Sequence, residues 1–415
     1  MGVDPTGASL HIGHLVVLLP LLHFYLKGHF CYGIVGGGTS RIGDPSGKMK
    51  ERKNMSLECI TDNCLKIENQ LDKFFKNGTA YALKRGYDSS KIGKYYIINN
   101  LTWYNQLSLF DFLKIVGSNI RLKRMLSRDS VKNRLESDRG INYSEFTYQL
   151  LQAYDFWYLN KHHNVSLQIG GSDQWGNIVS GIELINKMNP QENQTDSLIF
   201  RKEPYGMIVP LLLKKNGEKI GKSSGNAIWL NPDMFSPYEL YQYFIQSSDE
   251  IVEKYLKFFT LLPLDVIYEI IKQHSNNPEK RYAQHKLAEE IVMLIHGQEE
   301  MEKSRTVAKL LFSNQEKDKE LEISHIFKVL SDKQDIITLS KKKVIGMTIS
   351  QIIRESKVIS SKSKINKLIQ NGGVCNNKEK ITNPLTHVTE DWLIGKKFLI
   401  LKLGKKRHII INVEN

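Results

Sequence analysis

Two histidines stand three residues apart near the start of the chain, directly after a segment rich in turn formers. The segment DPTGASLHIGH (residues 4–14) precedes an apolar run that suits a helix, with Ser9 placed to cap it. His11 and His14 would share one helix face and present donors to the same ligand. Because free N–H groups and the positive dipole end of a helix attract anions, the stretch predicts a phosphate seat. An incidental pair of histidines is the alternative.

A pair of lysines has the same spacing some 200 residues later. Lys219 and Lys222 lie in LLKKNGEKIGKSSGNA (residues 212–227), which glycines interrupt. A flexible cationic loop can close over a polyphosphate and neutralise the charge that grows in the transition state. An exposed hairpin without a catalytic role is the other reading of this segment.

Three polar residues are spaced to share one face of a third segment. In FTYQLLQAYDF (residues 146–156), Tyr148, Gln152 and Asp155 are four and three apart, so one helix face can present all three. A carboxylate among apolar neighbours is costly unless it has a partner, which favours a binding role for Asp155. Ordinary amphipathicity is the alternative explanation.

Alternating strands and helices must position these residues. We expect strands at 31–37, 95–100 and 166–171, and helices after the histidines and at 57–75, 146–159 and 174–187. This order predicts an α/β fold, with a parallel sheet covered by helices on both faces and ligands beyond the carboxyl ends of the strands. Helices dominate after Pro232, and a short basic region with a hairpin around Gly404 ends the chain.

Composition limits the class of protein. No apolar run is long enough for a membrane span, and the four cysteines form no CxxC pair, which predicts reduced thiols in an intracellular protein. The net charge is +14, and residues 341–407 hold 16 Lys and Arg against 4 Asp and Glu. This surplus predicts a polyanion such as nucleic acid as the partner, unless it is only a solvated lysine-rich surface.

HIGH (residues 11–14) together with KIGKS (residues 219–223) resembles the two signatures of class I aminoacyl-tRNA synthetases. GGGTSRIGDPSGKMKER (36–52), FTYQLLQAYDF and LQIGGSDQWGN (167–177) resemble the tyrosyl-tRNA synthetases of bacteria and organelles. The tail, with SKSKINKLIQNGGVCNN (361–377), resembles an S4-like RNA-binding domain. The resemblance implies a Rossmann-like catalytic domain (1–230), a helical domain on the anticodon side (231–325) and a small α+β S4-like domain (340–415).

The resemblance also implies roles for individual residues. The phosphates of ATP would contact Thr6, His11, His14, Lys219 and Lys222, with Lys48 and Arg52 as further transition-state contacts. Gly13 would let adenine approach the helix, and Asp173, after Gly170 and Gly171, would bind the ribose. Asp155 would accept the tyrosine phenol, while Asp44, Tyr148 and Gln152 hold the ammonium group. Asp4 and Gln174 would bind the aminoacyl moiety, and Gln168 would line the amino-acid pocket.

The implied reaction is that of a tyrosine–tRNA ligase. The tyrosine carboxylate attacks the α-phosphate of ATP, pyrophosphate leaves, and the tyrosyl group passes to the 3′ end of tRNA(Tyr). Mg²⁺ would accompany ATP, held mainly by phosphates and water, and the enzyme would be a homodimer that does not enter membranes. The alternatives are a tryptophanyl-tRNA synthetase and an RNA-binding or intron-splicing protein on a synthetase scaffold.

Two further expectations follow from details of the same comparison. The family has a tyrosine and its strand just before the GxDPT block, and here both are absent, which predicts weaker tyrosine binding and a sheet without its first strand. The segment GKSSGNAIWLN resembles organellar forms of the family. It predicts that the protein is located in the mitochondrial matrix, with the cytoplasm as the alternative.

Overall fold

The computed structural model describes residues 1–46, 55–137, 140–188, 203–211, 227–312, 336–376, 379–393, 397–404 and 407–414. The chain divides into two units, Met1–Gln298 and Glu299–Asn415. No helix of the described residues is both long and apolar enough to cross a bilayer.

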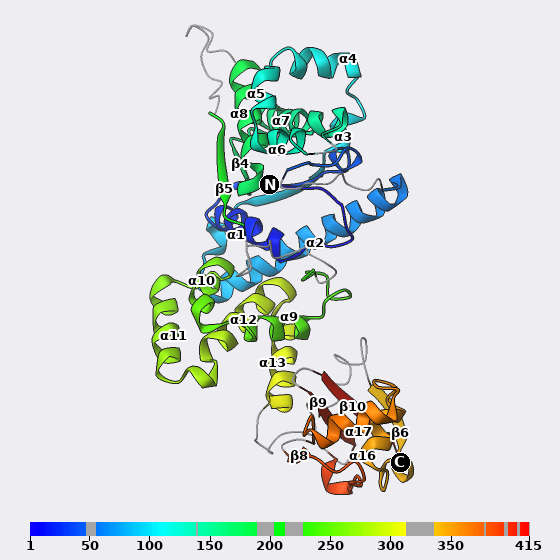
Figure 1. Cartoon of the computed structure of the whole chain (residues 1–415). Helices are drawn as coiled ribbons and strands as arrows, with labels where there is room; N and C mark the ends of the chain where they lie inside the picture. The colour runs from blue at the N-terminus through cyan, green and yellow to red at the C-terminus, as the bar shows by residue number, and fades with distance from the viewer. Residues whose placement is uncertain are drawn as a thin grey trace. The chain divides into compact units, whose positions relative to one another are not determined.

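Parallel strands form the centre of the first unit (Figure 1). β1 (Gly2–Val3), β2 (Phe30–Val35) and β3 (Lys94–Asn99) pair in that order, and β4 (Leu167–Gly171) pairs with β5 (Tyr205–Val209) in a second ladder. Val3 is in register with Val35, and Val35 with Asn99, so these three strands end together. The residues that follow them therefore meet at one edge, as expected for ligand sites of parallel sheets.

The predicted α/β class is confirmed, but the predicted loss of the whole first strand is wrong. Gly2 and Val3 pair with β2, and Ile34 N–H donates to the carbonyl of Met1 at 2.8 Å. The reason is that a parallel ladder needs only a short extended segment to form, and these residues already provide it.

Helices cover both faces of these strands, with α7 and α8 on one side and α1 and α2 on the other (Figure 1). The helices of this unit are α1 (Ile12–Leu26), α2 (Leu57–Lys84), α3 (Leu101–Tyr104), α4 (Leu109–Phe112), α5 (Leu122–Leu126), α6 (Asp129–Leu135), α7 (Tyr143–His163), α8 (Trp175–Met188), α9 (Pro237–Ile245), α10 (Asp249–Phe259), α11 (Leu264–Asn276) and α12 (Tyr282–His296). Short helical turns are η1 (Thr39–Arg41), η2 (Ser89–Lys91), η3 (Leu113–Gly117), η4 (Ser172–Gln174) and η5 (Pro278–Lys280).

α2 is longer than the predicted helix over residues 57–75. Its buried positions continue through Gly78 to Tyr81 and Ala82. A Cβ at Gly78 would lie 2.8 Å from Leu22 Cδ1, so this glycine allows α2 to pack closely against α1. The apolar stripe of α2 therefore continues beyond residue 75, where the predicted helix ended.

α7 carries the predicted polar face and has defined ends. Asn142 caps its first turn by accepting the N–H of Glu145 at 2.8 Å, and Asn164 ends it in the left-handed region at φ 55°. Its apolar residues, among them Phe156 and Trp157, pack into a core with Leu184 of α8. This packing fixes the rotation of α7 and the direction of its polar side chains.

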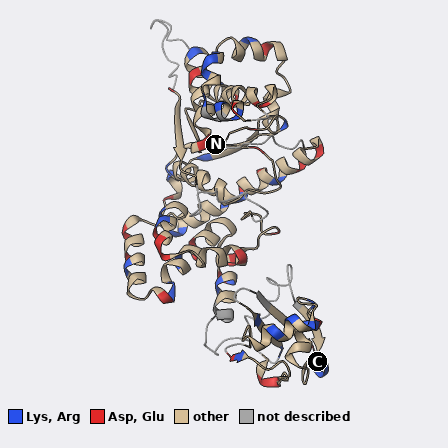
Figure 2. Ribbon diagram, in the orientation of Figure 1, with Lys and Arg blue, Asp and Glu red and all other residues tan. Residues whose placement is uncertain are grey.

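The second unit has a sheet with strand order β6-β10-β9-β7-β8. Its elements are α13 (Gln298–Phe312, beginning at the division), β6 (Ile336–Ser340), α15 (Lys341–Val344), α16 (Ile349–Glu355), α17 (Lys362–Gln370), β7 (Val374–Asn376), β8 (Glu379–Ile381), η6 (Glu390–Trp392), β9 (Phe398–Leu403) and β10 (Arg407–Glu414). β9 and β10 are antiparallel, which confirms the predicted hairpin, and Gly404 follows β9 with φ 62°. Ile352 and Ile365 are fully buried in its core, while Lys and Arg lie on its surface (Figure 2).

Candidate active site

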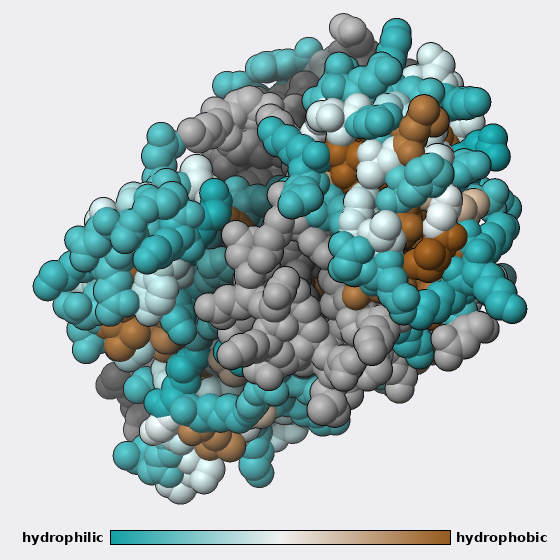
Figure 3. Space-filling view, turned by 90° about the horizontal axis from the view of Figure 1, so that it is seen from below, coloured by the Kyte–Doolittle hydropathy of each residue, from teal (hydrophilic) through white to brown (hydrophobic). Residues whose placement is uncertain are grey.

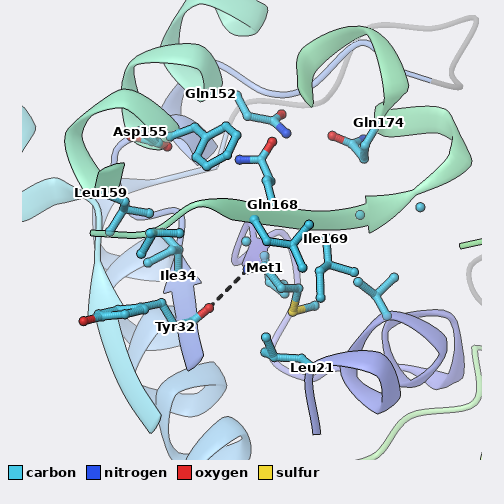
Figure 4. A pocket seen from close by; sticks show the side chains of 18 of the residues that line it. Met1, Leu21, Tyr32, Ile34, Gln152, Asp155, Leu159, Gln168, Ile169 and Gln174 are labelled. Atoms are coloured by element: carbon cyan, nitrogen blue, oxygen red, sulfur yellow. Dashed lines mark hydrogen bonds between the residues drawn. The ribbon is translucent and has the colours of Figure 1, made fainter. Parts of the chain in front are cut away.

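One cavity of about 1230 Å³ lies beyond the carboxyl ends of the parallel strands. Every predicted site residue that the structure describes lines it: Asp4, Thr6, His11, Gly13, His14, Asp44, Tyr148, Gln152, Asp155, Gln168, Gly170, Asp173 and Gln174. In Figure 4, Gln152 and Asp155 come from α7 and Gln168 reaches into the same space from β4. The predicted Lys48, Arg52, Lys219 and Lys222 lie outside the described residues.

Asp155 is a buried carboxylate whose two oxygens are both held. Trp103 Nε1 donates to Oδ1 at 2.8 Å and Asn100 Nδ2 donates to Oδ2 at 3.0 Å. Burial raises the pKa of Asp155 to about 7, and the negative charge of Asp4 acts in the same direction against the lowering effect of the donors. The carboxylate therefore has a fixed orientation and changes its charge close to neutral pH.

Two further carboxylates of the pocket, those of Asp4 and Asp44, also accept side-chain hydrogen bonds. Tyr148 Oη donates to Asp4 Oδ2 at 2.8 Å, and Gln174 Nε2 donates to Asp44 Oδ2 at 2.8 Å. The family resemblance assigned Tyr148 and Asp44 to the ammonium group of tyrosine, and Gln174 and Asp4 to the aminoacyl moiety. Both pairs line the same cavity, and the ligand contacts assigned to their residues stay predictions.

Two glutamine side chains extend this polar wall. Gln152 Oε1 accepts from Asn177 Nδ2 at 2.9 Å, which fixes the orientation of its amide. Gln168 Oε1 is enclosed yet has no hydrogen-bond partner among the described residues. A buried acceptor without a partner is costly, so Gln168 offers a place for a donor of a bound ligand.

The two histidines of HIGH cap the first turn of α1 reciprocally. His11 Nδ1 accepts the N–H of Gly13 at 3.1 Å, and His14 Nδ1 accepts the N–H of His11 at 3.0 Å. A neutral imidazole that accepts at Nδ1 carries its proton on Nε2. The rings stack with centroids 3.8 Å apart, so both rings present N–H donors from one place.

The predicted use of free N–H groups at the start of α1 is wrong. Ile12 N–H donates to the carbonyl of Ile228 at 3.0 Å, and the N–H groups of His14 and Leu15 both donate to the carbonyl of His11. With the N–H of Gly13 held by His11 Nδ1, the four N–H groups of this turn all have acceptors inside the protein. A phosphate at this helix start would therefore have to be bound by side-chain donors, because the caps already use the backbone groups.

A short segment that follows the lysine loop is joined to HIGH by backbone bonds. Trp229 forms an antiparallel bridge with His11, and Leu230 N–H donates to the carbonyl of Leu10 at 2.8 Å. The sequence predicted that HIGH and the segment at 212–227 act together. Residues 228–230, directly after that segment, lie against HIGH, while Lys219 and Lys222 lie outside the described residues and their role stays a prediction.

α2 holds the loop that precedes HIGH. Gln70 Oε1 accepts the N–H of Leu10 at 2.9 Å, and Gln70 Nε2 donates to the carbonyl of Ala8 at 3.1 Å. Asn63 Nδ2 donates to the carbonyl of Pro5 at 3.1 Å. These two amides fix the backbone on both sides of the turn, and no sequence motif pointed to them.

Known proteins match nearly the whole chain. A family model described as tRNA synthetases class I (W and Y) matches residues 1–313, and one described as the tyrosine–tRNA ligase SYY-like C-terminal domain matches residues 328–411. The mitochondrial tyrosine–tRNA ligase of Rattus norvegicus is 39% identical over 415 residues, which cover 99% of this chain and 84% of that protein. The chain belongs to the class I tyrosyl-tRNA synthetases.

Further relatives come from bacteria and from solved structures. The tyrosine–tRNA ligase of Latilactobacillus sakei is 38% identical to this synthetase over 414 residues, 100% of this chain and 91% of that protein. A C-terminally truncated mitochondrial tyrosyl-tRNA synthetase of Aspergillus nidulans superposes with a TM-score of 0.68 at 38% identity, covering 75% of this chain and 84% of that one. These relatives support a synthetase specific for tyrosine. They support neither a tryptophanyl-tRNA synthetase nor a scaffold without catalysis.

Some residues of this synthetase pocket escaped the sequence analysis. Thr39 and Asn100 line the cavity, and Trp103 reaches Asp155 from α3. Thr39 and Asn100 lie just beyond β2 and β3, so the rule that ligands bind at the carboxyl ends of parallel strands was the available signal. Trp103 gave none, because an aromatic residue in a short helix is ordinarily part of the core.

Proposed function

We propose that this chain activates tyrosine with ATP and transfers the tyrosyl group to tRNA(Tyr), using the pocket described above. The observation that carries the proposal is the fixed and buried Asp155 carboxylate in the same cavity as His11 and His14. Asp155 accepts the phenol at one end. The two histidines donate to phosphates at the other.

No side chain has to act as nucleophile or general base. The tyrosine carboxylate is already ionised and attacks the α-phosphate of ATP in line, and pyrophosphate leaves. Catalysis then consists of positioning and of neutralising charge on the leaving phosphates. His11 and His14 supply Nε2–H donors for this, together with Thr6 and, from the sequence, Lys48, Arg52, Lys219 and Lys222.

The tyrosine ammonium group is assigned to the polar wall opposite the phosphates. Asp44, Tyr148 and Gln152 contribute acceptors, and the unpartnered Oε1 of Gln168 supports placing a donor there. Asp4 and Gln174 contact the aminoacyl moiety. Gly13 and Asp173 bind the adenosine, with Gly170 leaving room beside Gln174: a Cβ at Gly170 would come within 3.1 Å of Gln174 Cβ.

Mg²⁺ enters with ATP, held mainly by phosphates and water. Among the described residues, no three side chains of His, Cys, Asp or Glu come together to hold a metal ion. Hard cations bound to nucleotides usually keep several waters, so such a cage is not required for this chemistry.

The C-terminal unit is assigned to RNA binding. Lys362, Lys364 and Lys367 lie exposed on α17, and Arg354 and Lys357 lie exposed at the end of α16. A cluster of cations on one small unit suits the phosphates of tRNA. We assign residues 1–230 to catalysis, 231–325 to the anticodon side and 340–415 to this S4-like domain.

A homodimer is supported by an exposed apolar segment. Phe110 is 82% exposed and Tyr143 is 75% exposed. Further large apolar residues are exposed between them, namely Leu113, Leu122, Leu126 and Leu135. The face drawn in Figure 3 is in contrast mostly hydrophilic, with its apolar residues in separate groups. Exposed large apolar side chains gathered in one segment favour an interaction site, so a second copy of the chain is the proposed partner.

The mitochondrial matrix is the proposed location. Two observations support it: the sequence of residues 221–231, which resembles organellar forms, and the mitochondrial relative from Rattus norvegicus. Bacterial relatives of similar identity keep the cytoplasm as the alternative. A fluorescent fusion of the complete gene product that fails to colocalise with mitochondria would overturn the assignment.

Tyrosine-dependent exchange of pyrophosphate into ATP tests the activity. The purified chain should catalyse exchange with tyrosine, not with tryptophan, and should then charge tRNA(Tyr). Tight RNA binding without exchange would instead identify a splicing scaffold, and exchange with tryptophan would identify the other amino acid.

A further inference from the structure

Thr39 and Asn100, which lie beyond two adjacent strands, join two carboxylates of the tyrosine pocket, those of Asp4 and Asp155. Asp4 follows β1, Thr39 lies in η1 beyond β2, and Asn100 follows β3. Thr39 Oγ1 donates to Asp4 Oδ1 at 2.7 Å, and Asn100 Nδ2 donates to Thr39 Oγ1 at 3.0 Å. The same Asn100 nitrogen donates to Asp155 Oδ2 at 3.0 Å. A continuous chain of hydrogen bonds therefore runs from Asp155 to Asp4.

The direction of each bond in this chain is determined. Gly38 N–H donates to Asn100 Oδ1 at 2.8 Å, so the amide must present its two N–H groups to Thr39 and Asp155. The Thr39 hydroxyl has one proton, which it gives to Asp4, and it accepts from Asn100. Thr39 and Asn100 are 3% and 1% exposed, so little water has access to these bonds.

The backbone around the chain is shaped to allow it. A Cβ at Gly36 would lie 2.1 Å from Asp4 Oδ1 and 2.4 Å from Thr39 Oγ1. The glycine therefore leaves the space in which the Asp4 and Thr39 side chains meet. This explains one glycine of the run at 36–38 by a requirement of the site.

We infer that Thr39 and Asn100 are positioning residues that couple the two ends of the amino-acid site. This inference rests on the proposed function, because Asp155 is assigned to the phenol, and Asp4, which Tyr148 also contacts, to the aminoacyl end. Asn100 holds Asp155 in line for the phenol while Thr39 holds Asp4. A break at Thr39 leaves one Asn100 N–H without an acceptor and removes the donor to Asp4 Oδ1, so that Asp4 keeps only the bond from Tyr148 at Oδ2. Loss at the aminoacyl end therefore also disturbs recognition of the phenol.

Substitutions at Thr39 test the coupling with matched controls. Thr39→Val removes the hydroxyl at nearly constant shape, and Thr39→Ser keeps it. Thr260→Val is the control for losing a buried hydroxyl elsewhere, since Thr260 is 5% exposed and its Oγ1 both donates to the carbonyl of Leu256 and accepts the N–H of Leu262. We expect Thr39→Val to weaken tyrosine binding about tenfold or more and to lower the preference for tyrosine over phenylalanine. Thr39→Ser and Thr260→Val should stay within about twofold of wild type, and the KM for ATP should not change.

Asn100→Ala allows a second measurement, whose result would not change if Asn100 had only a structural role. It removes a donor that stabilises the ionised form of Asp155, so the pH midpoint of tyrosine binding should rise. Equal tyrosine binding by Thr39→Val and Thr39→Ser, or an unchanged midpoint in Asn100→Ala, would overturn the inference. Absence of tyrosine-dependent exchange in the wild-type chain would instead overturn the proposed function.

Discussion

Tyrosine binding should weaken as the pH falls through neutrality, because the phenol needs an ionised Asp155. Burial raises the pKa of this carboxyl to about 7, so in the free protein it is charged above that pH and neutral below it. The apparent affinity scales with the fraction in the competent state. At pH 6 about a tenth of the molecules are ionised, which predicts roughly tenfold weaker binding than at the alkaline plateau.

Equilibrium dialysis with labelled tyrosine, without ATP, measures this dependence between pH 5.5 and 8.5. Phenylalanine is the internal control, because it has no hydroxyl to donate and its binding should not weaken toward acid pH. Histidines that line the pocket, such as His162 and His163, would affect both amino acids alike. Parallel pH profiles for the two amino acids, or a flat profile for tyrosine, would refute the assignment of Asp155.

Three other outcomes are expected. Gln70→Met removes the amide that holds Ala8 and Leu10, so the KM for ATP should rise about tenfold with unchanged tyrosine affinity. A matched change at the exposed Asn69 should have no effect. Equal effects of the two substitutions would contradict the role given to Gln70. Phe110→Glu should yield monomers in sedimentation experiments, whereas Leu264→Glu, at a residue 57% exposed on α11, should not; a wild-type chain that sediments as a monomer would disprove the dimer. Lys364→Glu with Lys367→Glu should weaken tRNA binding and reduce the slope of log K against log salt by about one for each lost phosphate contact, with exchange unaffected. Unaltered salt dependence would remove the RNA role from α17.

The sequence predicted the alternation of strands and helices because the spacing of apolar residues is a local property, whereas most residues of the pocket were named through the family resemblance. A period of three and four marks the face of α7, and HIGH lies in one short stretch. The roles given to single residues came from the resemblance, and they remain predictions until substitutions are measured.

The hydrogen-bond partners could not be predicted, because they depend on which segments meet in space. Nothing in the sequence near Asp155 indicates Trp103 or Asn100, which reach it across more than fifty positions. The N–H groups expected to be free at the start of α1 are occupied, one by the carbonyl of Ile228 and the other three by the side chain and carbonyl of His11. Likewise, the pairing of Tyr148 with Asp4 reflects how β1 enters the site, which spacing along α7 cannot encode.

The reciprocal cap of His11 and His14 gives each imidazole two duties, one on each nitrogen. Nδ1 accepts a backbone N–H of the first turn, and Nε2 carries the proton that the proposed function assigns to the phosphates of ATP. Asparagine at these positions could still accept a backbone N–H through its side-chain carbonyl. Its amide N–H would not reach as far as the Nε2–H of histidine. A variant that keeps the Nδ1 acceptor but lacks the Nε2–H group can therefore fold normally and still fail in the proposed binding of ATP.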